Sequence, residues 1–340
     1  MKAVVYDSKR KLMVADVPMP ELSDNEALVK VVNTGFCGSD HSLIESGGLG
    51  NGTIIGHEVS GTVADVGRNV DGPSVGERVM IRPTYCGACR ECRLGKPYLC
   101  QVERRTIGLG DFQGGFAEYC KVDPRMLIPV PVGVDSQNAA LAEAFAASLH
   151  GIECSGKKEG SALVIGGGSI GLALVRLLKI MGFGPIALSE PVEKKRVIAG
   201  LYGADAVIDP FHENLIVRAM DETGGKGFDS VFECSGAVES VQAAINTAAV
   251  GGTVCIVSII MKNIEIIPLT LNFKEVWLTG SYSNTHEENI RCLNWMKEGK
   301  IDGRPLISDY IGLDDLPRVY EERIDTGEAV KVMIRIGEEF

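Results

Sequence analysis

Long apolar runs are missing from this sequence: no stretch approaches the roughly 18 uninterrupted apolar residues that a membrane-spanning helix needs. Residues 1–11 form a short apolar run broken by polar residues, without the longer apolar segment of a secretory signal peptide. Basic residues do not offset the acidic ones, since 34 Lys and Arg face 45 Asp and Glu, for a net charge of −11. This balance argues against nucleic acid or an anionic membrane as a partner. We therefore expect a cytosolic protein that binds neither.

Internal repeats, low-complexity segments and blocks of like charge are also absent from the sequence. Its 340 residues correspond to about two domains. Within residues 1–150, short strand-like runs at 27–32, 61–66 and 77–82 are separated by closely spaced turn residues. This pattern is typical of a mostly β domain of irregular barrel type.

A different pattern begins after about residue 156, where apolar runs alternate with helical periodicity. Six of these runs are strand-like: 161–165, 186–188, 207–208, 230–233, 253–257 and 276–279. Strands that alternate with helices predict an α/β fold with a doubly wound parallel sheet, here of six strands. A helix at 287–298 and a strand-like tail at 331–336 follow. We expect the tail to return to the first domain, which gives one domain of 1–150 with 286–340 and a second of 151–285.

A glycine-rich turn links the first strand of this second domain to a helical pattern. Its residues are Gly166, Gly167, Gly168, Ser169, Ile170 and Gly171. They fit G-x-G-x-x-G, which is a weak signal alone and a stronger one between a strand and a helix. Glycines let the backbone approach a pyrophosphate, which the N-terminus of the next helix stabilises. We predict a dinucleotide site here, and the alternative is a plain strand–turn–helix.

An acidic residue stands where the next strand ends. Glu190 follows Gly171 by about the 20 residues that are usual for a carboxylate that accepts hydrogen bonds from the adenosine ribose. Its charge would repel a ribose 2′-phosphate, which favours NAD over NADP. Lys194, Lys195 and Arg196 come soon after and could weaken this preference, although a solvated helix face is their simpler role. Arg196 is kept as a candidate cofactor contact.

Ten cysteines are present, and a reducing compartment does not favour disulfides between them. Four of them form C-x2-C-x2-C-x7-C: Cys86, Cys89, Cys92 and Cys100. Four thiolates in one loop can enclose a tetrahedral zinc ion and leave no position for a substrate, so we predict a structural zinc site. The alternatives are an iron–sulfur cluster, whose usual bacterial spacing differs, or four idle thiols.

Five further cysteines are scattered in mostly apolar surroundings: Cys120, Cys154, Cys234, Cys255 and Cys292. We interpret them as small buried apolar residues. The tenth, Cys37, lies in a turn of small residues after a strand-like run, and His57 and Glu58 lie in a second Gly-containing segment. One Cys, one His and one carboxylate with an open fourth position suit a catalytic zinc. From spacing alone, a Cys and a His this far apart are more often unrelated.

Together these motifs resemble the zinc-containing branch of the medium-chain dehydrogenase/reductase superfamily, nearly from end to end. The matching segments are CGSD at 37–40, GHE-x-x-G at 56–61, the four-cysteine loop, GGFAEY at 114–119, GGGSIG at 166–171 and FECSG at 232–236. The resemblance implies a GroES-like catalytic domain and a Rossmann domain that binds NAD. It further implies two zinc ions per subunit and a homodimer or homotetramer, whose subunits often join at the strand near Val276.

The resemblance also assigns the zinc ligands. Cys37 and His57 would bind the catalytic zinc directly. The third ligand is a Cys in many primary alcohol dehydrogenases and a Glu in the sorbitol and threonine dehydrogenase-like group. Glu143 falls at that position, which places the chain nearer the polyol branch, although an acid at a helix N-terminus is a simpler explanation of it. Glu58 would be either a ligand or a carboxylate that enters the zinc shell during turnover.

The proton relay departs from the family pattern. Ser39 matches the usual relay hydroxyl. The relay His that many members carry five residues after the zinc Cys is replaced by Ser42, and the nearest histidine is His41. We therefore assign the relay to Ser39 and leave the role of His41 open.

The implied reaction is the oxidation of a secondary alcohol or polyol by NAD⁺, with zinc lowering the pKa of the substrate hydroxyl. An L-threonine 3-dehydrogenase-like or primary alcohol dehydrogenase activity is the main alternative. The retained zinc ligands argue against a zinc-free quinone reductase and against a non-catalytic structural protein. Candidate pocket residues are Leu43, Ile107, Phe145 and the segment near Tyr282, and an apolar core position is the simpler interpretation of each.

Overall fold

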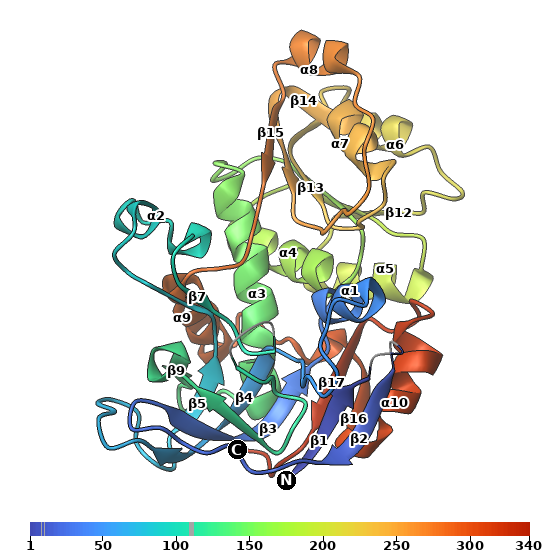
Figure 1. Ribbon diagram of the computed structural model, residues 1–340. Coiled ribbons are helices and arrows are strands. Elements are labelled where there is room, and N and C mark those ends of the chain that lie inside the picture. Colours follow the sequence, from blue (N-terminus) through green and yellow to red (C-terminus); the bar gives the residue numbers. More distant parts are fainter. Residues whose placement is uncertain (8, 10, 109–111) are drawn as a thin grey trace. The chain divides into compact units, whose positions relative to one another are not determined.

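The computed structural model describes residues 1–7, 9, 11–108 and 112–340 (Figure 1). The chain forms two compact units, residues 1–143 with 289–340 and residues 144–288. It passes from one unit to the other within two helices, α3 (Ser136–Cys154) and α9 (His286–Lys297). In the described part of the chain, every helix is too short or too polar to cross a membrane.

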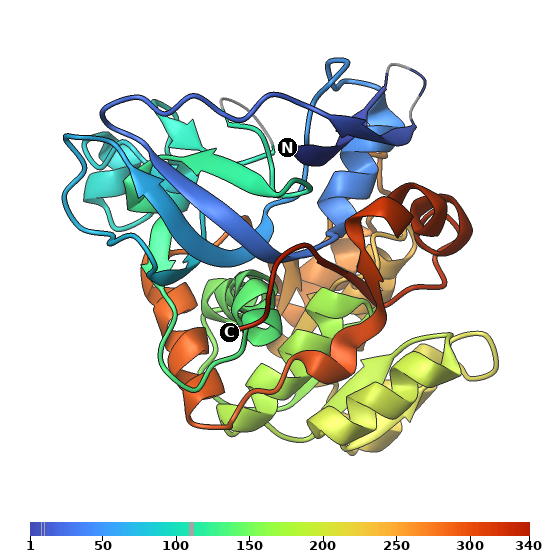
Figure 2. The ribbon, with the colours of Figure 1, turned by 90° about the horizontal axis from the view of Figure 1, so that it is seen from below.

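The first unit is built on a largely antiparallel sheet with the strand order β16-β17-β3-β4-β5-β9, and β8 also pairs with β3. Its strands are β3 (Ala27–Gly35), β4 (Glu58–Val66), β5 (Arg78–Ile81), β8 (Tyr119–Val122), β9 (Leu127–Pro129), β16 (Ile307–Gly312) and β17 (Lys331–Arg335). The C-terminal strand β17 pairs with β3, with Ile334 opposite Thr34. The last segment of the chain therefore completes the sheet formed by its first part, as Figure 2 shows from below.

Smaller elements complete this unit. They are β1 (Lys2–Tyr6), β2 (Leu12–Asp16), α1 (Gly38–Ser46), β6 (Thr84–Tyr85), α2 (Arg90–Arg93), β7 (Arg104–Arg105) and α10 (Leu316–Val319). β1 pairs with β2, and β6 pairs with β7, both antiparallel. The CGSD segment, which the sequence places in a turn, forms the start of α1, with Cys37 as its N-cap.

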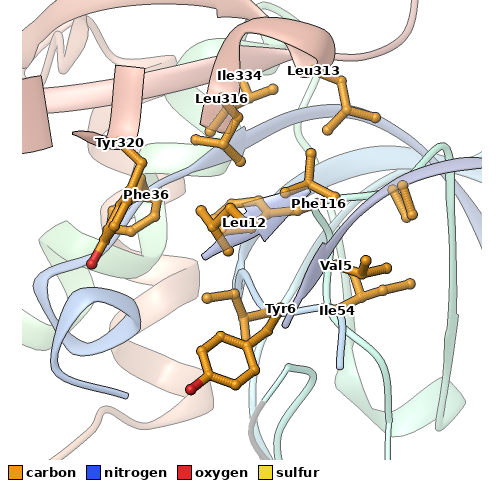
Figure 3. Close-up of a cluster of buried hydrophobic side chains, with 14 of the residues drawn as sticks. Val5, Tyr6, Leu12, Phe36, Ile54, Phe116, Leu313, Leu316, Tyr320 and Ile334 are labelled. Atoms are coloured by element: carbon orange, nitrogen blue, oxygen red, sulfur yellow. The ribbon is translucent and has the colours of Figure 1, made fainter. Parts of the chain in front are cut away.

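Aromatic side chains from the first part of the chain and from its C-terminal segment pack together in the core of this unit. The rings of Phe36 and Phe116 stack with centroids 5.6 Å apart, and the ring of Tyr320 lies 5.8 Å from that of Phe36. Figure 3 shows Leu316 and Ile334, from the C-terminal segment, in the same cluster. Fully burying one large apolar side chain contributes about 1.5–3 kcal/mol, so this cluster anchors the turn that precedes Cys37.

The second unit contains a parallel sheet with the order β12-β11-β10-β13-β14-β15. Its strands are β10 (Ala162–Ile165), β11 (Ile186–Ser189), β12 (Ala206–Ile208), β13 (Phe228–Glu233), β14 (Ala248–Ile256) and β15 (Trp277–Gly280). Its helices are α4 (Ser169–Ile180), α5 (Glu193–Tyr202), α6 (Leu215–Glu222), α7 (Ser240–Thr247) and α8 (Pro268–Lys274). Because each parallel crossover is right-handed, α4 and α5 cover one face and α6 and α7 the other.

This arrangement confirms the predicted doubly wound sheet of six parallel strands. The predicted bounds differ most at β14, which begins at Ala248 instead of residue 253. Gly251 and Gly252 interrupt the apolar run there, and the pairing with β13 shifts register between Phe228 and Ser230. The early part of β14 therefore carries no apolar periodicity that a sequence reading could detect.

Candidate functional site

The glycine-rich turn lies between β10 and α4, with Gly168 as the N-cap of the helix. Gly166 has φ 102°, and a Cβ on it would lie 2.7 Å from the backbone nitrogen of Ser235. A Cβ on Gly171 would lie 1.9 Å from the carbonyl oxygen of Gly166. Both positions therefore require glycine, whereas Gly168 faces open space. Ser169 and Ile170 begin α4, so the turn presents a helix N-terminus of the kind that binds phosphate groups.

Glu190 directly follows β11 and is only 5% exposed. Its Oε2 accepts a hydrogen bond from the Gly167 N–H at 2.6 Å, and its Oε1 accepts one from the Val192 N–H at 2.9 Å. The carboxylate is therefore fixed against the glycine-rich turn. Each oxygen retains a second lone pair, so these bonds are compatible with the predicted contact to a ribose hydroxyl.

Arg196 makes more contacts than a residue on a solvated helix face, the simpler role that we considered for it. Its Nη1 donates to the carbonyl oxygens of Glu190 and Pro191, both at 2.7 Å, and lies 3.1 Å from Asp209 Oδ2. Only 17% of its side chain is exposed. The position brings its guanidinium beside Glu190, while the ion pair with Asp209 offsets part of its charge.

The four cysteines of the predicted structural site converge. Their Sγ–Sγ separations are 3.5–3.9 Å across the pairs Cys86–Cys92, Cys89–Cys92, Cys89–Cys100 and Cys86–Cys100. Four sulfurs about 2.3 Å from one tetrahedral ion would lie about 3.8 Å apart, so the set fits zinc without rearrangement. Among the described residues, this is the one group of three or more His, Cys, Asp or Glu side chains whose possible ligand atoms all lie within 4.8 Å of one another.

Electrostatics within this cysteine set also favour a cation. Burial raises the pKa of Cys92, and hydrogen bonds with the neighbouring thiols help to bring it to about 12. Burial also raises the pKa of Cys100, but hydrogen bonds from nearby backbone groups outweigh it and lower that pKa to about 6. Sulfurs this close cannot all be ionised unless a positive charge lies among them.

The pairing of β3 with β4 brings the second predicted ligand group together. Gly35 lies opposite Glu58 in this pair, so Cys37 and His57 stand just beyond the same end of the two strands. Asp40 connects them: its Oδ2 accepts from the Cys37 N–H at 3.0 Å, and its Oδ1 lies 3.2 Å from His57 Nδ1. Ser39 Oγ lies 3.5 Å from the other ring nitrogen, Nε2.

Asp40 is a site residue that the sequence analysis missed, although it belongs to the quoted CGSD segment. It is fully buried, and its carboxylate holds Nδ1 of His57, which leaves Nε2 facing Ser39. Burial lowers the pKa of His57, but the charge and hydrogen bond of Asp40, together with Cys37, raise it well above its ordinary value. Metal-binding histidines commonly have such a carboxylate on the nitrogen away from the metal.

Lys331 is the second residue that the sequence analysis missed. Its Nζ lies 2.6 and 2.8 Å from the two carboxylate oxygens of Glu58, and both side chains are fully buried. A Cβ on Gly35 would lie 1.9 Å from Glu58 Oε2, so the glycine at this position leaves room for the pair. The Glu58 carboxylate is thus held by an ammonium group, not directed at Cys37 and His57.

Glu143 lies on α3 and is 8% exposed. Burial lowers the pKa of Lys331, but the charges of Glu58, Cys37 and Glu143 outweigh it and raise that pKa. Glu143 and Cys37 therefore act on the same buried ammonium. The structure does not close Cys37, His57, Glu58 and Glu143 into one tight ligand set, which leaves their joint coordination a prediction.

The structure also places the residues considered for the proton relay and for the substrate pocket. His41 Nδ1 is 3.2 Å from the Tyr320 hydroxyl, and Ser42 Oγ donates to the Gly38 carbonyl within α1. Of the proposed pocket residues, Ile107 and Phe145 are buried core residues, Leu43 is half-buried and Tyr282 is 52% exposed.

Comparisons with known proteins agree with these features. Residues 23–132 match the alcohol dehydrogenase GroES-like domain, and residues 169–298 match the zinc-binding dehydrogenase domain. The chain is 29% identical to the sorbitol dehydrogenase of Bacillus subtilis, over 98% of this chain and 97% of that protein. It is 30% identical to the L-threonine 3-dehydrogenase of Pyrococcus abyssi, over 92% of this chain and 91% of that protein.

A solved structure is also similar. A putative zinc-binding dehydrogenase from Sinorhizobium meliloti 1021, bound to NADP, has a TM-score of 0.90 and 32% identity, and the match covers 98% of each chain. Because such relatives match nearly the whole chain, and both family domains occur in it, this protein belongs to the zinc-containing medium-chain dehydrogenases, a family of oxidoreductases.

Proposed function

We propose that this enzyme oxidises a secondary alcohol or polyol with NAD⁺ and that Cys37, His57 and Glu143 hold its catalytic zinc. The observation that carries the proposal is the His57 ring, with Asp40 on Nδ1 and Ser39 Oγ 3.5 Å from Nε2. A thiolate, an imidazole and a carboxylate are the donor types of a catalytic zinc, which keeps one position for substrate. Glu58 would join that set only after leaving Lys331.

Zinc, when bound, would polarise the substrate hydroxyl, and NAD⁺ would accept the hydride. The chain's own residues prepare that step. Asp40 fixes the orientation of His57, and Ser39 can accept the hydroxyl proton beside Nε2. Lys331 offsets the charge of Glu58, so fewer uncompensated anions surround the Cys37 thiolate. A second zinc, in the set of Cys86, Cys89, Cys92 and Cys100, would be structural.

The cofactor preference rests on Glu190. Its buried carboxylate, fixed against the glycine-rich turn, would repel a ribose 2′-phosphate, whereas Arg196 is engaged by Asp209 and two carbonyl oxygens. We therefore propose NAD, with Gly166, Gly168, Ser169, Ile170 and Gly171 lining the pyrophosphate site. Initial rates with NAD⁺ and NADP⁺ test this preference, and a higher kcat/KM with NADP⁺ would refute the role given to Glu190.

Substrate class is tested by a screen of secondary alcohols, polyols and primary alcohols with NAD⁺, followed by NADH absorbance, with zinc content measured alongside. Cys37→Ala and His57→Ala should abolish turnover while NADH still binds. Full activity in such variants after verified loss of zinc would disprove the zinc mechanism. L-threonine belongs in the screen, because threonine dehydrogenases are about as similar to this chain as sorbitol dehydrogenase is.

A small-molecule alcohol is thus the expected partner, and a homodimer or homotetramer the expected assembly. Support for the assembly comes from β15, which lies at an edge of its sheet, and from exposed apolar side chains on and near it. Phe273 is 78% exposed and Trp277 is 73% exposed. Large apolar groups beside an open strand edge are typical of surfaces covered by another subunit.

A further inference from the structure

A cysteine, a histidine and a glutamate form a chain of contacts within the second unit. His150 and Cys154 lie four residues apart on α3 and therefore on the same helix face. Cys154 Sγ is 3.4 Å from His150 Nε2, and His150 Nδ1 is 2.8 Å from Glu288 Oε1. His150 is 3% exposed and Glu288 is 9% exposed. A thiol beside an imidazole that a carboxylate orients is the arrangement used to activate cysteine nucleophiles.

The glutamate is held in place by the start of α9. Glu288 Oε2 accepts from the Thr285 N–H at 2.6 Å, and the Glu288 N–H donates to Thr285 Oγ1 at 3.2 Å. This reciprocal cap uses one carboxylate oxygen and leaves the other for the imidazole. The carboxylate can therefore orient the His150 ring without any rearrangement of the helix end.

The imidazole carries a proton that it can give away. Burial lowers the pKa of His150, but hydrogen bonds with Cys154 and Glu288 and their negative charges outweigh it and raise the pKa to about 9. Below that pH the ring is doubly protonated, with Nδ1 donating to Glu288 and Nε2 facing the sulfur. In this form Nε2 can donate a hydrogen bond to a thiolate and can protonate a leaving group.

Cys154 also lines a pocket. The pocket has a volume of about 420 Å³ and is bordered by the residues that follow α3 and by parts of β14 and β15. Ser155, Lys157, Thr253 and Thr279 give it polar walls. Cys154 is half-buried, so its sulfur is not sealed in the core as we expected for the scattered cysteines. Cys255 fits that expectation, because it is fully buried and burial helps to raise its pKa to about 12.

We propose that Cys154 is a redox modification site at which a small hydroperoxide, ROOH, oxidises the thiol to a sulfenic acid. The thiolate attacks the outer peroxide oxygen, so an S–O bond forms while the O–O bond breaks. Sulfur loses two electrons, and the peroxide is reduced. The leaving alkoxide, or hydroxide when R is hydrogen, takes the Nε2 proton of His150. Glu288 is a positioning residue that keeps the ring in line with the sulfur.

The first test measures thiol reactivity in the zinc-loaded, full-length protein. Iodoacetamide labelling at neutral pH is followed for each cysteine by peptide mass spectrometry. Cys234 serves as an internal comparator, because it is also half-buried while burial and the Glu233 charge raise its pKa well above the ordinary value. Cys154 should react on the order of tenfold faster than Cys234 or more. Equal labelling rates would overturn the proposal.

The second test treats the protein with hydrogen peroxide and traps sulfenic acid with dimedone. Dimedone should label Cys154, and the label should be lost in Cys154→Ser. Absence of the adduct after peroxide treatment would overturn the proposal. The reaction is run above and below the concentration at which the assembly dissociates, because β15 lines the pocket. Labelling confined to the dissociated chain would also overturn it.

Two variants separate activation from simple exposure. His150→Asn should slow both reactions by about tenfold and move the pH profile of labelling. Glu288→Gln keeps an acceptor for the Thr285 N–H, so it preserves the helix cap and serves if His150→Asn does not fold. It should also slow both reactions and shift that profile. Rates and profiles unchanged in a folded variant would show that His150 and Glu288 have only a structural role.

Discussion

A lysine and a glutamate form a fully buried ion pair in the first unit, where neither side chain is exposed to solvent. The Lys331–Glu58 pair is held by two short contacts, and the ammonium also donates to the Phe36 carbonyl at 3.1 Å. Replacement of one partner leaves the other as an uncompensated buried charge, which costs more than the pair itself contributes.

Lys331→Met should therefore lower the free energy of unfolding by about 3–5 kcal/mol, measured by urea denaturation. The double variant Lys331→Met/Glu58→Leu should recover most of that loss, because neither charge of the pair remains. Lys2→Met provides the control: Lys2 also contacts a carboxylate, that of Asp314 at 2.8 Å, but both are exposed and the loss should be small. A similar loss in the single and double variants would contradict the argument.

Asp40 acts on one ring nitrogen of His57 and on the N-cap of α1. Asp40→Asn removes the charge that holds this ring, so we expect zinc affinity to fall about 10–100-fold, measured by competition with a chelator. Ser42→Ala on the same helix is the matched control and should leave zinc affinity unchanged. Equal zinc affinity in Asp40→Asn and the parent protein would show that Asp40 only caps the helix.

These residues also mark the limit of prediction from sequence at this scale. Cys37 and His57 could be assigned to a catalytic zinc only through the family resemblance, because from spacing alone a Cys and a His this far apart are more often unrelated. Lys331 could not be singled out, because its partner lies on another strand far away in the chain, and strand periodicity reports burial without reporting charge pairing. Asp40 carried a readable signal, an acid three residues after an N-cap, which fits a capping pattern. Cys154 was misjudged because apolar neighbours in sequence do not determine what lies beside a side chain in space.

At the scale of elements, helices and strands whose apolar residues repeat with one period over several residues were predicted well. The strands β10, β11 and β13 and the helix α9 lie close to their predicted bounds, because their apolar periodicity matches real burial. The order of the strands was not predicted, because a right-handed crossover fixes which face of the sheet a helix covers and not which strands pair. The predicted β14 was too short, because the first half of the strand is defined by backbone pairing and contains two adjacent glycines.

The loop of four cysteines is an element with almost no core of its own. Neither α2 nor the short helical turn Pro97–Leu99 contains a buried residue. Apolar burial therefore contributes little to its structure. If the proposed zinc ion is bound, the sulfurs, which lie 3.5–3.9 Å apart, would provide most of the anchoring through it.

Cys89→Ser should thus remove one zinc per chain, lower the melting temperature by on the order of 5 °C, and expose residues 86–100 to proteolysis. Cys154→Ser, outside the loop, should keep the full zinc content. Calorimetry, metal analysis and limited proteolysis measure these effects. An unchanged melting temperature and digestion pattern after verified zinc loss would contradict a structural role.

At the scale of the whole molecule, the two edges of the parallel sheet differ in what surrounds them. β15, which follows α8 in the chain, lies at one edge, and β12 lies at the other. Near β15, Leu269 is 59% exposed, Phe273 78% and Trp277 73%. Near β12, Phe211 is 81% exposed. The open backbone groups of an edge strand and a group of apolar side chains together favour a symmetric contact in which β15 of one copy meets β15 of another.

Phe273→Asp should weaken that contact, because it places a charge in an apolar surface. In a symmetric dimer each copy would bury one such charge. Sedimentation velocity over a range of concentrations should show a shift toward a smaller species. Phe211→Asp introduces the same change at the opposite sheet edge, at a similarly exposed phenylalanine, and should leave the assembly intact. If the two variants sediment alike, or if only Phe211→Asp dissociates, the β15 edge is not where the copies meet. A dimer that persists in Phe273→Asp while a tetramer is lost would place this surface between dimers instead.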